Sequence, residues 1–133
     1  MKKVSRENLD ALFAAIAEAK KLYLPVADGT DEKRGVKYSV WTPEAKYAAE
    51  AVNTVRSAKD FFFPQVENLL TFKTSGKEVA LEQNIPPAGV TIVMGVRACD
   101  ARSFKILDKV FLKVPVDTYY KTRREQCVLI GVG

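Results

Sequence analysis

The chain carries an apolar run followed by a polar turn at residues 89–104, GVTIVMGVRACDARSF, and a second apolar run at residues 127–133, CVLIGVG. Val90–Val96 is short and nearly continuous in apolar residues, which is typical of a strand buried on both faces. Apolar residues recur at helical spacing over Phe104–Leu112, and Val128–Val132 predicts a second buried strand. This order predicts a parallel βαβ unit. Its first loop, Arg97–Asp100, is expected at the carboxyl edge of the sheet, where ligands and partners usually bind.

The rest of the chain predicts a mixed sheet with flanking helices. In chain order we expect a helix over 5–21, strands over 21–26 and 36–41 paired as a hairpin around a polar loop at 27–35, a helix from Pro43 that becomes irregular by Val55, one or two helical turns over 57–64, strands over 67–73 and 78–83 paired as a second hairpin, and a short helix over 118–125. Pro25 is expected to end the first strand, and Ser57 to cap the helical turn. Tyr38 and Trp41 are expected in the core or at an edge, with a pocket lining as the alternative.

The length of 133 residues suffices for one domain with its own core. We therefore predict a single α/β domain over residues 1–133. Its architecture is a mixed sheet with a C-terminal parallel βαβ unit, hairpins and flanking helices.

The composition excludes several chemistries. The chain has two cysteines, Cys99 and Cys127, and no histidine. A Ser–His or Cys–His nucleophile pair cannot be built, and the usual ligands for zinc are too few. Two cysteines also cannot supply the four ligands of an iron–sulfur cluster. Because Cys99 follows one strand and Cys127 begins another, we expect the two at opposite edges of the sheet, without a disulfide.

Basic residues exceed acidic ones, 21 against 16, which gives a formal charge of +5. Small clusters lie at Arg97–Arg102 and Lys121–Arg124, and they are either solvated surface or a docking face for an acidic protein or an anionic ligand. We find no nucleic-acid-binding motif and no apolar stretch long enough to insert into a membrane. The polar residues between Ser5 and Asp10 interrupt any secretory signal, so we expect a cytoplasmic protein.

Three segments together resemble a known family. They are SAKDFFFPQ at residues 57–65, GVRACDARS at 95–103 and DTYYKTRRE at 117–125. In this order they are similar to the amino-terminal region of iron–sulfur electron-transfer subunits, a family that includes the beta subunit of soluble nickel–iron hydrogenases of the sulfhydrogenase type and the corresponding iron–sulfur subunit of anaerobic sulfite reductase. The resemblance covers the second half of the chain well and the first half loosely. The family usually has Pro where this chain has Ala98, which leaves an extra backbone N–H and a less rigid turn.

The resemblance implies a role in electron transfer with the redox centres outside this segment. In the family, the polypeptide continues past the equivalent of Gly133 into a cysteine-rich region with two [4Fe–4S] motifs, whereas this chain ends directly after an apolar run. We therefore expect residues 1–133 to be the amino-terminal fragment of a longer iron–sulfur protein, without a cofactor of its own. The expected partners are the catalytic and flavin-containing subunits of a redox complex, and we expect no catalysis by this domain alone.

The best site candidates are Arg97, Cys99, Asp100 and Arg102, as contacts to a cofactor or a partner. The start of a helix and the neighbouring arginines favour the thiolate form of Cys99, which could touch a cluster, a flavin or a partner. The alternative is structural. In that case Cys99 is a small buried residue and Asp100 caps the following helix. Arg97 would then pair with Asp100 or with another carboxylate.

Aromatic and basic residues elsewhere are candidates for a partner interface. They are Phe61, Phe62, Phe63, Tyr119, Tyr120, Arg123 and Arg124. Three consecutive phenylalanines cannot all lie on one face, so we expect at least one in the core and another exposed toward a partner. The two tyrosines are expected to divide between core and interface, and the two arginines form either a solvated face or a contact to a partner.

Two further functions stay open beside electron transfer. One is a stand-alone small-molecule domain that binds a flavin or a nucleotide at the Gly95–Asp100 edge, although that edge lacks the Gly-x-Gly-x-x-Gly phosphate fingerprint. The other is a non-catalytic interaction domain. A ligand-sized cleft would favour the first, whereas a bare apolar patch would favour docking.

Overall fold

The computed structural model describes residues 4–27, 35–51, 53–86 and 89–132. The elements within these ranges are η1 (Arg6–Asn8), α1 (Leu9–Ala19), β1 (Lys21–Ala27), β2 (Val36–Val40), η2 (Ala58–Phe61), β3 (Leu70–Ser75), β4 (Glu78–Gln83), β5 (Thr91–Val96), α2 (Ala98–Phe111), α3 (Thr118–Glu125) and β6 (Cys127–Gly131). Most of the polar loop expected at 27–35 lies outside the described residues.

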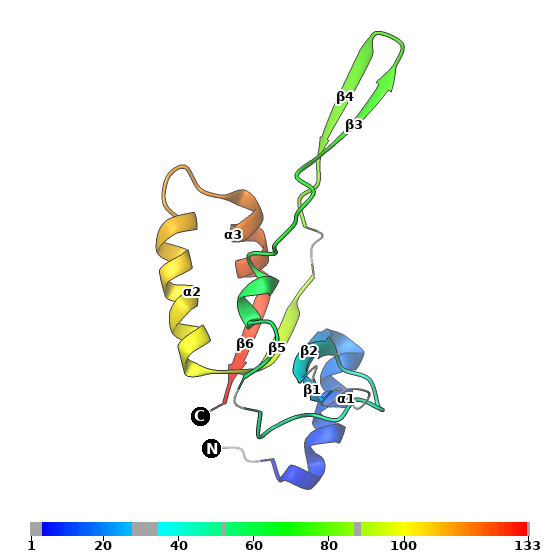
Figure 1. Cartoon of the computed structure of the whole chain (residues 1–133). Helices are drawn as coiled ribbons and strands as arrows, with labels where there is room; N and C mark the ends of the chain where they lie inside the picture. The colour runs from blue at the N-terminus through cyan, green and yellow to red at the C-terminus, as the bar shows by residue number, and fades with distance from the viewer. Residues whose placement is uncertain (1–3, 28–34, 52, 87–88, 133) are drawn as a thin grey trace.

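Four strands form the main sheet in the order β2-β1-β5-β6 (Figure 1). Strand β1 pairs antiparallel with β2 and parallel with β5, and β5 in turn pairs parallel with β6. The predicted first hairpin is therefore β1 with β2, and the predicted βαβ unit is β5 and β6 joined through α2 and α3. The α/β class and the mixed sheet are confirmed.

Helices cover both faces of this sheet. On one face, Phe13 of α1 packs with Leu22 and Leu24 of β1, and Ile92 and Met94 of β5 lie against the same cluster. On the other face, α2, α3 and η2 pack on the alternate side chains of the strands. The buried members of this second cluster are Ala58, Phe62, Val93, Val96, Phe104 and Tyr120. Successive strand residues thus divide between two cores, as the pleat of a strand requires.

The carboxyl end of β5 departs from this alternation at Gly95. The pairing with β6 shifts register between Met94 and Val96, and Gly95 has a φ of +83°. Regular alternation would put Met94 and Val96 on the same face, yet Met94 packs on the α1 side and Val96 in the α2 core. The extra residue of this β-bulge turns the chain over. It therefore aims the segment that follows, the start of α2, across the end of the sheet.

The helix predicted from Pro43 does not form. This segment instead runs along the end of β1, with an isolated bridge between Tyr47 and Val26. Ala27 donates its N–H to the Lys46 carbonyl at 3.3 Å, and Ala48 donates its own to the Pro25 carbonyl at 2.9 Å. Strand β5 pairs with β1 only from Lys21 to Tyr23, so the end of β1 is free to take these bonds. Tertiary pairing has overridden a local helix preference.

Other expectations at strand ends need correction. Pro25 does not end β1, which continues to Ala27, because Pro25 lies beyond the ladder with β5 and its missing N–H costs no bond there. The predicted turn Arg97–Asp100 is the N-cap position and first turn of α2. Strand β6 is an edge strand, and its Val128 is 48% exposed instead of buried.

The second predicted hairpin forms between β3 and β4, which pair antiparallel around Gly76. Figure 1 shows it extending away from the rest of the domain as a two-stranded arm, at the opposite end from the two chain termini. Over the described ranges, no helix is both long enough and apolar enough to cross a membrane.

Candidate functional site

The predicted site lines a small cavity at the carboxyl ends of β1 and β5, which we call the edge cavity. It is bounded by the bulge of β5, the start of α2 and the segment that replaces the predicted helix. Its volume is about 160 Å³. The lining residues are Pro25, Tyr38, Ala51, Asn53, Thr54, Ser57, Gly95, Arg97, Cys99 and Asp100. Three of the four predicted site residues therefore meet here.

Asp100 joins η2 to the start of α2. Its Oδ1 accepts hydrogen bonds from Ser57 Oγ at 2.7 Å and from Lys59 Nζ at 2.8 Å. Burial alone would raise the pKa of Asp100, but the hydrogen bonds from Lys59 and Ser57 and the charge of Lys59 together lower it. Asp100 lies in the first turn of α2 and not at its cap, so the structural alternative is wrong in that detail. Its carboxylate acts as a charged clamp between two segments.

Arg97 is held by a backbone carbonyl. Its guanidinium donates a hydrogen bond to the carbonyl of Ala51, in the segment that runs beside β1. Among the described residues this is the bond that fixes it, whereas the alternative derived from the sequence paired Arg97 with Asp100 or another carboxylate. The residue therefore closes one wall of the edge cavity and leaves its positive charge next to the opening.

Tyr38 supports the bulge from the neighbouring hairpin. Its hydroxyl donates a hydrogen bond to the Gly95 carbonyl at 3.1 Å, and its ring lies edge-on to that of Phe61 with centroids 5.7 Å apart. Burial, followed by the nearby charge of Asp100, raises the pKa of Tyr38 to about 12. The hydroxyl therefore stays protonated at neutral pH and remains a hydrogen-bond donor.

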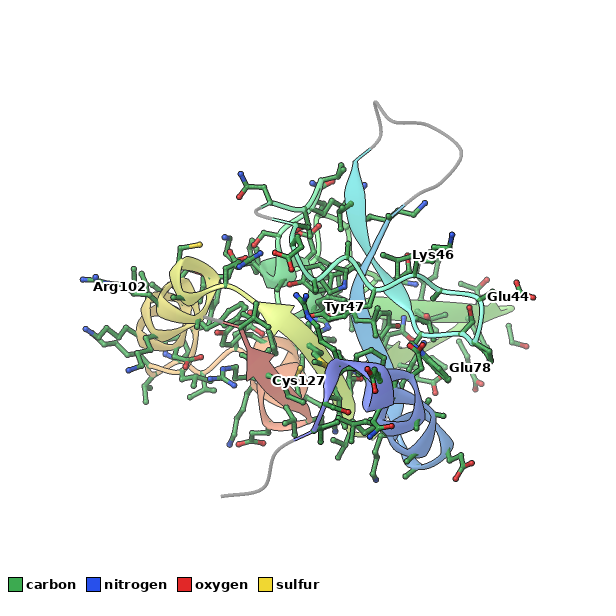
Figure 2. The ribbon with its side chains drawn as sticks, turned by 90° about the horizontal axis from the view of Figure 1, so that it is seen from below. Glu44, Lys46, Tyr47, Glu78, Arg102 and Cys127 are labelled. Atoms are coloured by element: carbon green, nitrogen blue, oxygen red, sulfur yellow. The ribbon has the colours of Figure 1, made fainter. Side chains whose placement is uncertain are left out.

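Cys99 and Arg102 are the predicted site residues that face solvent. Cys99 is exposed, so it is not the small buried residue of the structural alternative. Arg102 is exposed as well, and Figure 2 shows it pointing away from the body on the outer side of α2. A thiol and a guanidinium thus stand beside the edge cavity at the start of a helix, which suits contact with an acidic or anionic partner.

The three phenylalanines of η2 and its C-terminal flank divide as the sequence predicts. Phe62 is buried against Phe104, with ring centroids 4.9 Å apart. Phe61 is partly buried against the ring of Tyr23, whereas Phe63 is 54% exposed and rests on Phe111. Phe63 is therefore the member of the three that presents apolar surface to solvent.

Helix α3 contributes one buried network. Tyr120 is buried, and its hydroxyl donates to Asp108 Oδ1 of α2 at 2.7 Å. Arg124 Nε donates to the same oxygen at 3.1 Å, and its guanidinium lies 5.7 Å from the ring centroid of Phe62. Burial and the bond to Asp108 raise the pKa of Tyr120. These contacts hold α3 to α2 within the core.

The other two candidates on α3 brace the stem of the hairpin arm. Tyr119 donates its hydroxyl to the Leu69 carbonyl at 2.6 Å, and Arg123 forms an ion pair with Glu67 in which both side chains are only about one-fifth exposed. Arg123 is thus neither a solvated charge nor a free contact. It fixes the direction in which the arm leaves the domain.

The described residues do not fit a metal ion or an iron–sulfur cluster. Among them, no three potential ligand side chains come together. Cys99 follows the carboxyl end of β5, whereas Cys127 pairs with Thr91 at its start. A strand of this length separates its ends by roughly 15–20 Å, which excludes a disulfide or a shared metal. Any cluster that this domain serves is ligated elsewhere.

Sequence reasoning missed the residues that hold the site together. Lys59 and Ala51 reach Asp100 and Arg97 from more than 40 positions away, and a single sequence carries no signal for such pairs. Tyr38, expected in the core or at an edge, also lines the cavity. Ser57 caps η2 as predicted, since its side chain accepts from the Lys59 N–H, but its second bond to Asp100 has no counterpart in the sequence pattern.

Comparison with known proteins gives one informative match. No family model and no solved structure matches the chain. Sulfhydrogenase 2 subunit beta of Pyrococcus furiosus is 27% identical over 131 residues, which cover 98% of this chain and 36% of that subunit. The chain is a distant homologue of the N-terminal region of this hydrogenase subunit. It spans about a third of the length of the relative that it matches, and the resemblance found in the sequence is confirmed at the level of homology.

Proposed function

We propose that this chain is the scaffold and docking domain of an iron–sulfur electron-transfer subunit in a multisubunit oxidoreductase of the hydrogenase or sulfite reductase type. The observation that carries the proposal is the homology to a hydrogenase beta subunit over nearly the whole chain. In this proposal the two expected [4Fe–4S] clusters belong to polypeptide outside residues 1–133, and the catalytic and flavin-containing subunits are the partners.

The edge cavity supports docking better than ligand binding. Its volume of about 160 Å³ compares with roughly 300–1,000 Å³ for ordinary small-molecule sites, so it is too small to enclose a flavin. Two of its charged side chains are already engaged, Asp100 with Lys59 and Arg97 with Ala51. The alternative of a stand-alone flavin or nucleotide domain therefore gains no support from this geometry.

Exposed groups around the cavity supply the proposed contact. Cys99 and Arg102 lie on the solvent side of the first turns of α2, above a clamp that fixes the start of the helix. Positive charge at such a rim steers an acidic partner and sets the association rate more than the final affinity. In this proposal Arg102 orients the partner, and Cys99 lies at the contact without carrying out chemistry.

The test is charge reversal in the assembled complex. Arg102→Glu is expected to slow electron transfer between subunits about tenfold at low salt, because a loss of about 1.4 kcal/mol in steering is a factor of ten. The matched control is Lys109→Glu, which makes the same charge change on the same helix about 10 Å further from the cavity. Equal effects of the two variants, or no effect of either, would remove this rim from the proposed interface.

A further inference from the structure

The hairpin arm is amphipathic in a way that the proposed function does not use. In the antiparallel register, Phe72 lies opposite Leu81, Leu70 opposite Gln83 and Thr74 opposite Val79. Directly opposed residues share a face, so these six side chains form one side of the arm. The side is mostly apolar and carries no charge. The opposite side holds the charged and small residues Thr71, Lys73, Ser75, Glu78, Ala80 and Glu82.

The apolar side of the arm is uncovered. Leu70, Phe72, Val79 and Leu81 are 52%, 69%, 62% and 71% exposed. Together they present on the order of 400–500 Å² of apolar surface, which is as large as the largest patch on a typical monomer. An isolated two-stranded hairpin is marginally stable in water at best. A cover for this face would therefore stabilise the arm itself.

The arm leaves the domain in a fixed direction. Tyr119 and Arg123 of α3 hold Leu69 and Glu67 at the start of the stem. At its base Asn84 donates its N–H to the Leu69 carbonyl, and its side-chain Nδ2 donates to Thr71 Oγ1 at 2.7 Å. The stem is thus tied both to the body and across the two strands. Figure 1 shows the remaining length of the arm standing clear of the other elements.

We propose that the apolar face of β3 and β4 pairs with the same face of a second copy of this chain. Two arms packed face to face would bury roughly 1,000 Å² in total with the neighbouring Leu69 and Ile85, which are about half exposed. That area is at the lower limit for a specific interface, so the expected dimer is weak. A two-fold axis between the arms makes each residue meet its own equivalent neighbourhood.

The absence of charge on this face favours a copy of itself as the occupant. A face carrying net charge would bring like charges together across a two-fold axis, at a cost of several kcal/mol. Here Lys73, Glu78 and Glu82 all point to the other side of the arm, where they remain in water. Pairing along strand edges would extend the sheet but leave the apolar side exposed, so face-to-face packing is the arrangement that covers it.

The test is the molecular mass of the 133-residue chain in solution by sedimentation equilibrium, from about 1 to 200 µM. We expect the weight-average mass to rise toward twice the monomer value across this range. Leu81→Asp places a charge on the apolar face and is expected to raise the dissociation constant at least tenfold. The matched control is Ala80→Asp, which adds the same charge to the adjacent residue on the opposite face and should leave the mass curve unchanged. Circular dichroism shows whether each variant keeps its fold.

Each result decides the inference. A dimer that Leu81→Asp dissociates and Ala80→Asp does not supports it. A monomer at every concentration overturns it and assigns the face to a different polypeptide. A dimer that both variants leave intact overturns it too, because the copies then meet elsewhere. Higher aggregates without a dimer plateau contradict a closed two-fold pair. None of these results depends on whether the domain docks to a redox partner.

Discussion

Gly95 is the residue whose substitution tests the structural account of the edge cavity most sharply. Two separate costs apply to Gly95→Ala. The φ of +83° is unfavourable for any residue with a Cβ, by about 1–2 kcal/mol. The added Cβ would also lie 2.7 Å from Pro25 Cδ and 2.8 Å from Pro25 Cγ, and a proline ring cannot rotate out of the way. Forcing such overlap in a packed region costs about 1–3 kcal/mol more.

The expected destabilisation of Gly95→Ala is about 3 kcal/mol, and the assay is equilibrium urea unfolding followed by circular dichroism. Gly76→Ala is the matched control. Gly76 also has a positive φ, of +61°, but its Cβ would meet nothing within 4 Å. It carries the backbone cost of about 1–2 kcal/mol without the clash. The difference between the two variants therefore isolates the contact with Pro25.

A double variant separates the two costs within Gly95 itself. Pro25→Ala removes the ring atoms that the new Cβ would strike. In the Pro25→Ala/Gly95→Ala chain, we expect the loss of stability to be smaller than the sum of the single losses by about 1 kcal/mol or more. Additive losses, or a Gly95→Ala chain no less stable than Gly76→Ala, would refute the reasoning about the bulge.

Three further predictions concern charged, aromatic and thiol groups. Asp100→Ala is expected to cost about 1–2 kcal/mol at pH 7, discounted because Lys59 is partly exposed. The folded-state pKa of Asp100 is lowered, so its contribution is present above the ordinary carboxyl pKa and is lost as pH falls through the lowered value. Urea midpoints of wild type and Asp100→Ala should therefore converge toward low pH, and a constant gap would contradict this. Tyr120→Phe is expected to cost about 1 kcal/mol by removing the bond to Asp108, and a neutral effect in thermal unfolding would show that this bond contributes nothing net. Burial raises the pKa of Cys127 to about 11, so at pH 8 a disulfide reagent should modify exposed Cys99 at least tenfold faster. Cys99→Ser should abolish the fast phase, and a fast phase that persists would contradict the assignment.

The sequence predicts the main sheet and its helices because their signals are local. The apolar run of β5, the helical spacing of α2 and the turn at Gly76 each lie within a few residues. The failures have a common cause. The segment after Pro43 contains helix-favouring alanines, but the free end of β1 captures its backbone, and that end is free only because β5 stops pairing at Tyr23. Such an outcome depends on tertiary pairing that no local pattern records.

The candidate site follows the same division. Arg97, Cys99 and Asp100 could be located because parallel strands place the following loop at a known edge. Their partners could not, since Lys59 and Ala51 approach from a segment whose path was itself mispredicted. The bulge at Gly95 was also hidden, because a glycine inside an apolar run has the same appearance whether the strand is regular or not.

The measurement that tests the central claim most directly is the iron content and low-temperature electron paramagnetic resonance of the native assembly, isolated through an affinity tag on this chain under anaerobic conditions. Our account predicts that the isolated material contains iron and acid-labile sulfide, and that dithionite reduction produces the signal of [4Fe–4S] clusters, together with stoichiometric catalytic and flavin-containing subunits. Isolation of the chain without iron and without redox subunits would contradict the assignment of this domain to an electron-transfer subunit.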